Sequence, residues 1–150
     1  MPVEENIELM KRWYREVWRE AKNETIFELM APQASLHGQT GPEAEIKGPE
    51  GFVSFAEYIR EAFPDTEVMV EDIFGVADKV AIRWVATGTH TGRGLGVSPS
   101  GKRVTISGTT IVRILDGKIV EGWDNWDRLA MLEQIGAYSF SETPALANIA

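Results

Sequence analysis

The dipeptide Asp116-Gly117 constrains the fold of this chain more than any other feature, because it separates two stretches in which apolar and polar residues alternate. A two-residue type I′ turn needs positive φ angles at both central positions, and Asp and Gly tolerate them. The pair therefore predicts a β-hairpin in which Leu115 lies opposite Lys118. That register fixes which side chains share a face along both strands.

Near the open end of the hairpin, this register divides the side chains into one set of Thr110, Trp123, Asn125 and Asp127 and a second set of Arg113, Lys118, Asp124 and Trp126. Only the second face bears cations. We therefore expect the first face to line an apolar cavity, with Asp127 as an inward carboxylate at its rim. The second face then meets solvent or another subunit. A β-bulge would exchange the two faces and place Asp124 inside.

Length and composition limit the class of protein. The chain has 150 residues, which suits one domain large enough to enclose a cavity, and we expect that domain over 1–136 with a tail over 137–150. It has no Cys, so it has no disulfide or thiolate site. Its net charge of −8 argues against nucleic acid as a partner. The acidic N-terminus and the lack of a long apolar run predict a protein without a membrane anchor, in the cytoplasm.

Sequence periodicity changes from helical to strand-like along the chain. Helices are expected over 4–20, 23–31 and 48–63, and a last one follows Asp127 and ends at Gly136. Strands are expected over 34–37, 67–74 and 79–89 and in the hairpin, with a glycine-rich loop over 91–103. Helices followed by long strands predict an α+β fold. We expect a curved antiparallel sheet that forms a cone, with the N-terminal helices on its concave face.

Three segments in the second half carry a family resemblance: GTHTG at 88–92, SGTTIVRILDGKIVEGW at 107–123 and DRLAMLEQIG at 127–136. With the order of elements, they resemble the SnoaL-like polyketide cyclase family over about residues 4–136. That family lies in the superfamily of ketosteroid isomerase and nuclear transport factor 2. The resemblance implies the cone-shaped, nuclear transport factor 2-like α+β barrel of that superfamily.

The same resemblance implies an enzyme without a cofactor or metal. Its implied reaction is an intramolecular aldol condensation that closes a ring in a polyketide-like or other small hydrophobic carbonyl substrate. It further implies an Asp acid/base near the end of the last long strand, for which Asp127 is the best match and Asp124 the near alternative. The family's partner His on the preceding strand has no counterpart between Thr110 and Arg113.

The residues themselves support acid/base chemistry. A carboxylate between Trp123 and Trp126 loses hydration, so its pKa rises and it can take a proton from a carbon acidified by carbonyls. Asp127 also stands where the last helix needs an N-cap, and a carboxylate engaged as a cap is a poor base. Both roles for Asp127 stay open.

Other polar side chains complete the candidate site. His37 and His90 titrate near neutrality, and either could polarise a carbonyl, although for His37 we favour a structural role and two His alone do not predict a metal site. Arg83 either holds an anion in the cavity or lies on the outer sheet, which we favour. The predicted catalytic residues are Asp127, Asp124 and His90, and the predicted substrate-binding residues are His37, Trp123, Asn125, Trp126, Thr110 and Arg83.

Two alternative functions fit the same fold. A limonene-type epoxide hydrolase needs two carboxylates and an Arg around one water, and Arg83 is present. A ligand-binding or dimerisation module needs no catalytic group. An inward, poorly solvated Asp favours catalysis over both. Apolar residues on the outer sheet face, among them Ile111 and Val120, predict a homodimer or homotetramer.

Overall fold

A computed structural model of the chain describes residues 2–41 and 43–139. Its helices are α1 (Val3–Trp13), α2 (Asn23–Leu29), α3 (Gly48–Ala62) and α4 (Arg128–Gln134), with a π-helical segment η1 (Tyr14–Arg19) continuing α1. Its strands are β1 (Met30–His37), β2 (Glu45–Lys47), β3 (Glu67–Val76), β4 (Lys79–Thr89), β5 (Arg103–Leu115) and β6 (Lys118–Trp126). The last eleven residues of the predicted tail, 140–150, lie outside the described residues, and the domain boundary at 136 stays a prediction.

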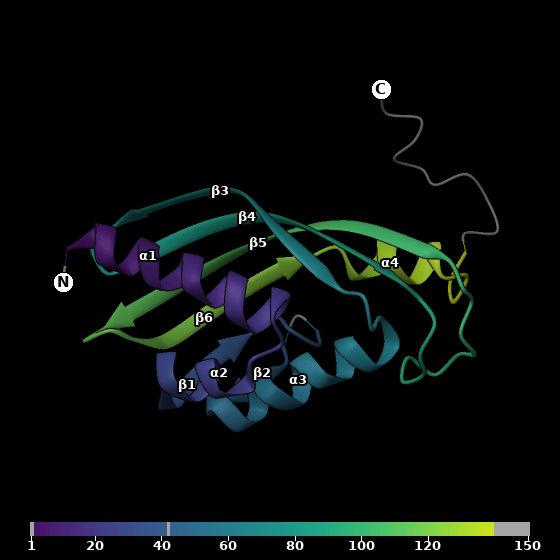
Figure 1. The fold of residues 1–150 in the computed structure, drawn as a ribbon, viewed down its shortest axis with the longest axis horizontal. Helices are drawn as coiled ribbons and strands as arrows, with labels where there is room; N and C mark the ends of the chain where they lie inside the picture. Colours follow the sequence, from purple (N-terminus) through teal and green to yellow (C-terminus); the bar gives the residue numbers. More distant parts are fainter. Residues whose placement is uncertain (1, 42, 140–150) are drawn as a thin grey trace.

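The six strands form one open sheet in the order β2-β1-β6-β5-β4-β3, and it arches over α1, α2 and α3 (Figure 1). The predicted α+β class is therefore confirmed. The expectation of a purely antiparallel sheet was wrong in one place, because β1 runs parallel to β6. The chain between β1 and β6 contains β2, α3 and the three strands β3 to β5. A connection of this length allows β1 to join the edge of the hairpin in the parallel direction.

Apolar stripes on the helices explain why they cover the sheet. Met10 and Trp13 of α1 and Phe52 and Phe55 of α3 are buried against the strands. Pro49 lies in the first turn of α3, where its missing N–H is not needed. None of the helices in the described residues is long and apolar enough to cross a membrane.

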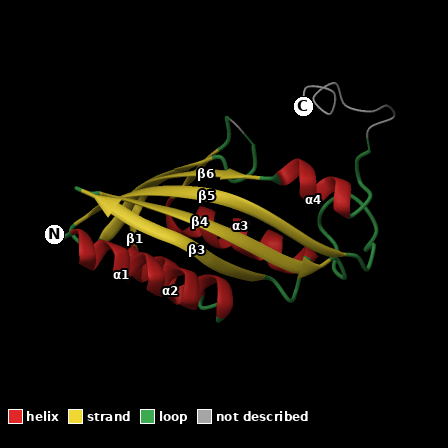
Figure 2. Cartoon of the chain, turned by 90° about the horizontal axis from the view of Figure 1, so that it is seen from above, coloured by secondary structure: helices red, strands yellow, loops and turns green. Residues whose placement is uncertain are grey.

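Helix α4 lies at the end of the sheet opposite the N-terminus (Figure 2). A second, smaller apolar cluster forms there from Ala62, Phe63, Val104, Met131 and Ile135. The side chain of Gln134 bonds the backbone of Thr105 in both directions, at 2.8 and 2.9 Å, which fixes the end of α4 to β5. The interior of the protein therefore has two apolar regions, a main core under the sheet and a minor one under α4.

The predicted hairpin turn is confirmed. Asp116 and Gly117 have φ angles of 50° and 73°, and Leu115 lies opposite Lys118. Beyond Ile114, however, the register shifts, because β6 contains one extra residue near Val120. Such a bulge reverses the faces of the strand that follows it.

The bulge makes the expected inner face of β6 wrong. Thr110 lies opposite Asp124 instead of Trp123. Because Ile119 and Gly122 are both buried although they are three residues apart, simple alternation cannot place them on one face. The extra residue allows both Ile119 and Gly122 to face the core, and it turns Asp124 inward and Trp123 outward.

Candidate functional site

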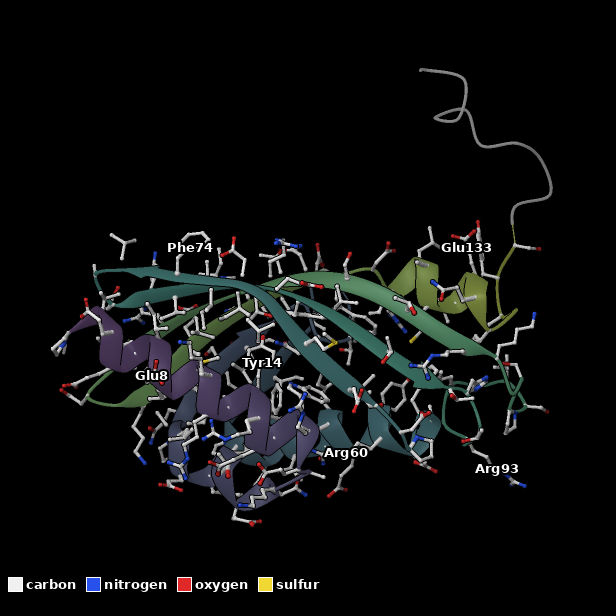
Figure 3. The ribbon with its side chains drawn as sticks, turned by 45° about the horizontal axis from the view of Figure 1, so that its top comes forward. Glu8, Tyr14, Arg60, Phe74, Arg93 and Glu133 are labelled. Carbon is white, nitrogen blue, oxygen red and sulfur yellow. The ribbon has the colours of Figure 1, made fainter. Side chains whose placement is uncertain are left out.

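The helices and the concave face of the sheet enclose a cavity of about 100 Å³. Most of its lining is apolar or aromatic, and polar side chains enter it from Tyr14, Thr66, Thr110 and Asp124. Figure 3 shows Tyr14 in the space between the first helix and the sheet. Apolar cavities with a few convergent polar groups are the usual form of small-molecule sites.

Asp124 supplies the carboxylate of this cavity. Its Oδ1 accepts a hydrogen bond from the Thr110 hydroxyl, and its Oδ2 accepts one of 3.0 Å from Gln39 Nε2. Burial raises the pKa of Asp124 above its ordinary value, while the hydrogen bonds from Thr110 and Gln39 act in the opposite direction. A carboxyl with these opposed influences can exchange a proton closer to neutrality than an exposed Asp.

Thr110 connects the carboxylate to the aromatic wall. Its hydroxyl donates to Asp124 and accepts a hydrogen bond of 2.9 Å from Trp84 Nε1. Because the Trp84 N–H polarises the hydroxyl, it strengthens the bond that Thr110 donates. Thr110 therefore fixes the orientation of the carboxyl from the sheet side.

Tyr14 faces the same group from the helix side and is buried. Burial raises the pKa of the Tyr14 phenol, the negative charge of Asp124 raises it further, and a hydrogen bond with Thr110 opposes both. The phenol thus stays protonated and can donate a hydrogen bond. Tyr14 is also the first residue of η1, and π-helical turns of this kind occur frequently at functional sites.

The loop after β1 holds the other side of Asp124. Gln39 is buried, and its backbone carbonyl oxygen accepts a hydrogen bond of 2.9 Å from Trp126 Nε1. Gly38 has a φ angle of 88°, and a Cβ at that position would lie 2.1 Å from the carbonyl oxygen of Asp124. Only glycine fits this close approach, which brings Gln39 within reach of the carboxyl.

Asp127 lies on the other side of the sheet from the position we predicted. Its Oδ1 accepts a hydrogen bond of 3.0 Å from the N–H of Ala130, so it is the N-cap of α4, and the residue is exposed. The bulge in β6 is the physical reason for this correction. Of the two candidate acids, it is Asp124 that lines the cavity.

Four of the predicted substrate-binding residues also lie on the outer face. His37 Nε2 lies 3.0 Å from Glu121 Oε2, and its ring stacks on Trp123 at 5.9 Å. Asn125 and Arg83 are exposed around an open groove on that face, which for Arg83 is the side we favoured. The structure therefore brings only Thr110 and Trp126 of this set to the cavity with Asp124.

His90 is fully buried beside the glycine-rich loop and does not line the cavity. Its Nδ1 accepts a hydrogen bond of 3.0 Å from the N–H of Ser100, and its ring packs on Phe63 at 5.5 Å. These contacts close the loop between the two residues. They give His90 a structural position away from Asp124.

Sequence reasoning missed three residues of the site: Tyr14, Gln39 and Trp84. Tyr14 and Trp84 belong to regular apolar patterns, in which an aromatic residue predicts packing and nothing more. Gln39 stands in an irregular loop. The one available signal was Gly38, since an isolated Gly directly after a strand can mark close approach to another backbone.

Comparison with known sequences connects this geometry to one family. The family model described as SnoaL-like polyketide cyclase matches residues 8–135. The chain is 27% identical over 133 residues to the aklanonic acid methyl ester cyclase DauD of Streptomyces sp. (strain C5), covering 87% of this chain and 81% of DauD. It is 26% identical to DnrD of Streptomyces peucetius, which has the same enzyme description, covering 87% of this chain and 90% of DnrD.

Solved structures give the same result. IdmH, a proposed polyketide cyclase from Streptomyces antibioticus, is 33% identical with a TM-score of 0.76, covering 86% of this chain and 96% of IdmH. A proposed SnoaL-like polyketide cyclase from Jannaschia sp. CCS1 is 28% identical with a TM-score of 0.81. The match covers 93% of this chain and 97% of the Jannaschia protein. The similarity therefore extends over nearly the whole length of each protein.

Proposed function

The chain belongs to the SnoaL-like polyketide cyclase family, and we propose that it closes a ring in a carbonyl-rich, hydrophobic substrate with Asp124 as the acid and base. One observation carries this proposal: a single carboxyl projects into an apolar cavity where burial raises its pKa. The names of the curated relatives support a methyl ester of a polyketide acid as the substrate class.

In the first step, the ionised Asp124 removes a proton from a carbon that lies between two carbonyl groups. The hydrogen bonds from Thr110 and Gln39 keep the carboxylate in one orientation at the cavity wall, and each oxygen retains a lone pair that can accept the proton. The electrons of the broken C–H bond form an enolate. Tyr14 is placed to stabilise the enolate oxygen, because its phenol stays protonated and points into the same cavity.

In the second step, the enolate carbon attacks a ketone carbon of the same molecule. The new carbon–carbon bond leaves an alkoxide on the former ketone, and the protonated Asp124 returns its proton to that oxygen. Substrate and product are isomers, so no cofactor or second substrate is required for balance. The apolar wall keeps water from quenching the enolate.

The alternatives lack a supporting observation. A limonene-type epoxide hydrolase needs two acids around one water, and Asp124 is the one carboxylate among the described residues that line the cavity. A binding module would have no need to bury a carboxyl, which costs free energy.

Aklanonic acid methyl ester and a simple β-keto ester are the two probes that test the proposal. Chromatography with mass detection should show a product of unchanged mass from aklanonic acid methyl ester. Proton NMR in D₂O should show protein-dependent exchange at the carbon between the two carbonyl groups of the β-keto ester. Both rates should rise with pH through the raised pKa of Asp124, because only the ionised form accepts a proton. Buffer-level rates for both probes would refute the proposal.

We also propose that the outer sheet face joins two copies of the chain. An apolar row crosses the sheet there through directly paired positions: Phe74, Ala81, Ile111 and Trp123. Phe74 projects from that face in Figure 3 and is 60% exposed. A two-fold axis along β5 would set Ala81 of one copy against Trp123 of the other, and Lys79 against Glu121. The apolar row is therefore complementary to itself in size, and the Lys79 and Glu121 positions are complementary in charge.

Light scattering during size-exclusion chromatography tests this association. The native protein should elute at twice the monomer mass, and Ile111→Glu should elute as a folded monomer because two buried carboxylates would then meet at the axis. Phe27→Glu is the control, since Phe27 is equally exposed on α2, away from the sheet. A monomeric native protein would contradict the proposal.

A further inference from the structure

A second hollow of about 50 Å³ lies next to the first, between the end of α3, the end of β4 and α4. Phe63, Gly88, Val104 and Met131 line it and take no part in the first cavity. Five residues line both hollows: Ile59, Thr66, Ala86, Ile106 and Trp126. The second hollow, which we call the α4 chamber, therefore adjoins the cavity that holds Asp124 and shares part of its wall.

We propose that the α4 chamber is a subsite for the apolar end of the substrate whose carbonyl groups lie against Asp124 and Tyr14. The inference rests on the proposed cyclase function for the position of the reacting end. It adds a second binding region, and it assigns to that region a hydrocarbon group, either an alkyl chain or the edge of an unsubstituted ring.

The chemistry of the lining selects hydrocarbon. The chamber has no charged residue among those that line it, and its polar side chains are two threonines, Thr66 and Thr87. The Thr66 hydroxyl already donates to the carbonyl oxygen of Phe63 at 2.5 Å. A polar substituent would lose its hydration in the chamber without a new partner, whereas apolar cavities of this kind stay dry and accept apolar guests.

The position of Trp126 gives the distance between the two ends. Asp124 and Trp126 point to the same side of β6, two residues apart, which corresponds to about 7 Å along a strand. Trp126 Nε1 bonds Gln39 and its ring packs edge-on against Phe55 at 6.5 Å, so the indole is held in place. Substrate atoms that pass this ring therefore enter the α4 chamber at a fixed distance from the base.

The far wall of the chamber is also fixed. Met131 comes from α4, and α4 is attached at its start by the Asp127 cap and at its end by the two bonds between Gln134 and Thr105. A chamber with a fixed floor limits the length of the group that it accepts. The residues that set this limit are Val104 and Met131, which both line the chamber and belong to the minor apolar cluster.

A series of phenyl ketones with unbranched alkyl chains of increasing length tests the subsite, with binding measured by calorimetry. In the native protein, affinity should rise about fourfold per added methylene until the chain fills the chamber. Val104→Leu should end the rise one or two methylenes earlier, and Val104→Ala should extend it by a similar amount. Val80→Ala is the matched control, because Val80 is buried but lines neither hollow.

The series should give the same chain-length profile in Asp124→Asn, since the chamber binds hydrocarbon without the base. Loss of ring closure in that variant with an unchanged profile separates the subsite from the proposed reaction. Equal profiles for the native protein, Val104→Leu and Val104→Ala would show that the chamber is only a packing void and would overturn the inference.

Discussion

Replacing Asp124 by Asn is expected to reduce the rate of ring closure by about 10² to 10⁴-fold, because an amide cannot take the proton from carbon. The substitution keeps the size of the side chain, and its amide oxygen can still accept from Thr110 or Gln39. Binding of the substrate should therefore change much less than turnover. Steady-state kinetics with aklanonic acid methyl ester, or the exchange rate of the β-keto ester, measures the effect.

Asp127→Asn is the matched control for this prediction. Its carboxylate caps α4, so the substitution should leave turnover within a few-fold of the native value, and Asn is itself a good N-cap. A large loss in Asp127→Asn together with an active Asp124→Asn would assign the chemistry to the other carboxylate.

The same Asp124→Asn protein should be more stable than the native protein at neutral pH. Burial raises the pKa of Asp124 in the folded state. The neutral carboxyl therefore contributes its full stability below the unfolded-state pKa of about 3.9, and this contribution is lost as pH rises through the folded-state pKa. Asn does not ionise and keeps that stability. Thermal unfolding should show a higher Tm for the variant at pH 7 and no difference near pH 3.

Gly38→Ala is expected to destabilise the fold by about 2 to 4 kcal/mol and to impair turnover as well. The new Cβ would lie 2.1 Å from the carbonyl oxygen of Asp124 at a φ angle of 88°. The loop must therefore move away from β6, and Gln39 would lose its bond to the Asp124 carboxyl. Urea unfolding measures the stability, and the exchange rate of the β-keto ester measures the consequence for the base.

Gly117→Ala separates backbone strain from the clash. Gly117 has a similar φ angle of 73°, but a Cβ there would meet nothing within 4 Å. Its substitution should cost only about 1 kcal/mol and leave exchange unchanged. Equal losses of stability in the two variants would mean that the contact between Gly38 and Asp124 is unimportant.

The parts of the fold that depend on local chemistry could be predicted from the sequence. The turn at Asp116-Gly117, the start of α3 at Gly48-Pro49 and the cap at Asp127 each follow from the conformational preference of one or two residues. The succession of helices and long strands predicted the α+β class and the curved sheet, and the family resemblance added the nuclear transport factor 2-like barrel. These features need no knowledge of distant contacts.

The inner face of β6 could not be predicted, because tertiary packing determines the bulge near Val120. Ile119 and Gly122 must both enter the core, and no local pattern shows that requirement. Gln39 depends on the same region, because its partners in β6 are Asp124 and Trp126, two side chains on the face that the bulge turns inward. Sequence reasoning therefore missed the parts of the site that depend on contacts between segments far apart in the chain.

The extra residue in β6 means that the identity of the acid is encoded by chain length as well as by residue type. Removing one codon near Val120 would rotate every later side chain of the strand by half a turn and exchange the group that reaches the interior, although no functional residue would have been altered. Proteins of this architecture can thus gain or lose a reactive centre through a single insertion or deletion. A comparison of residue types at aligned positions would overlook such an event.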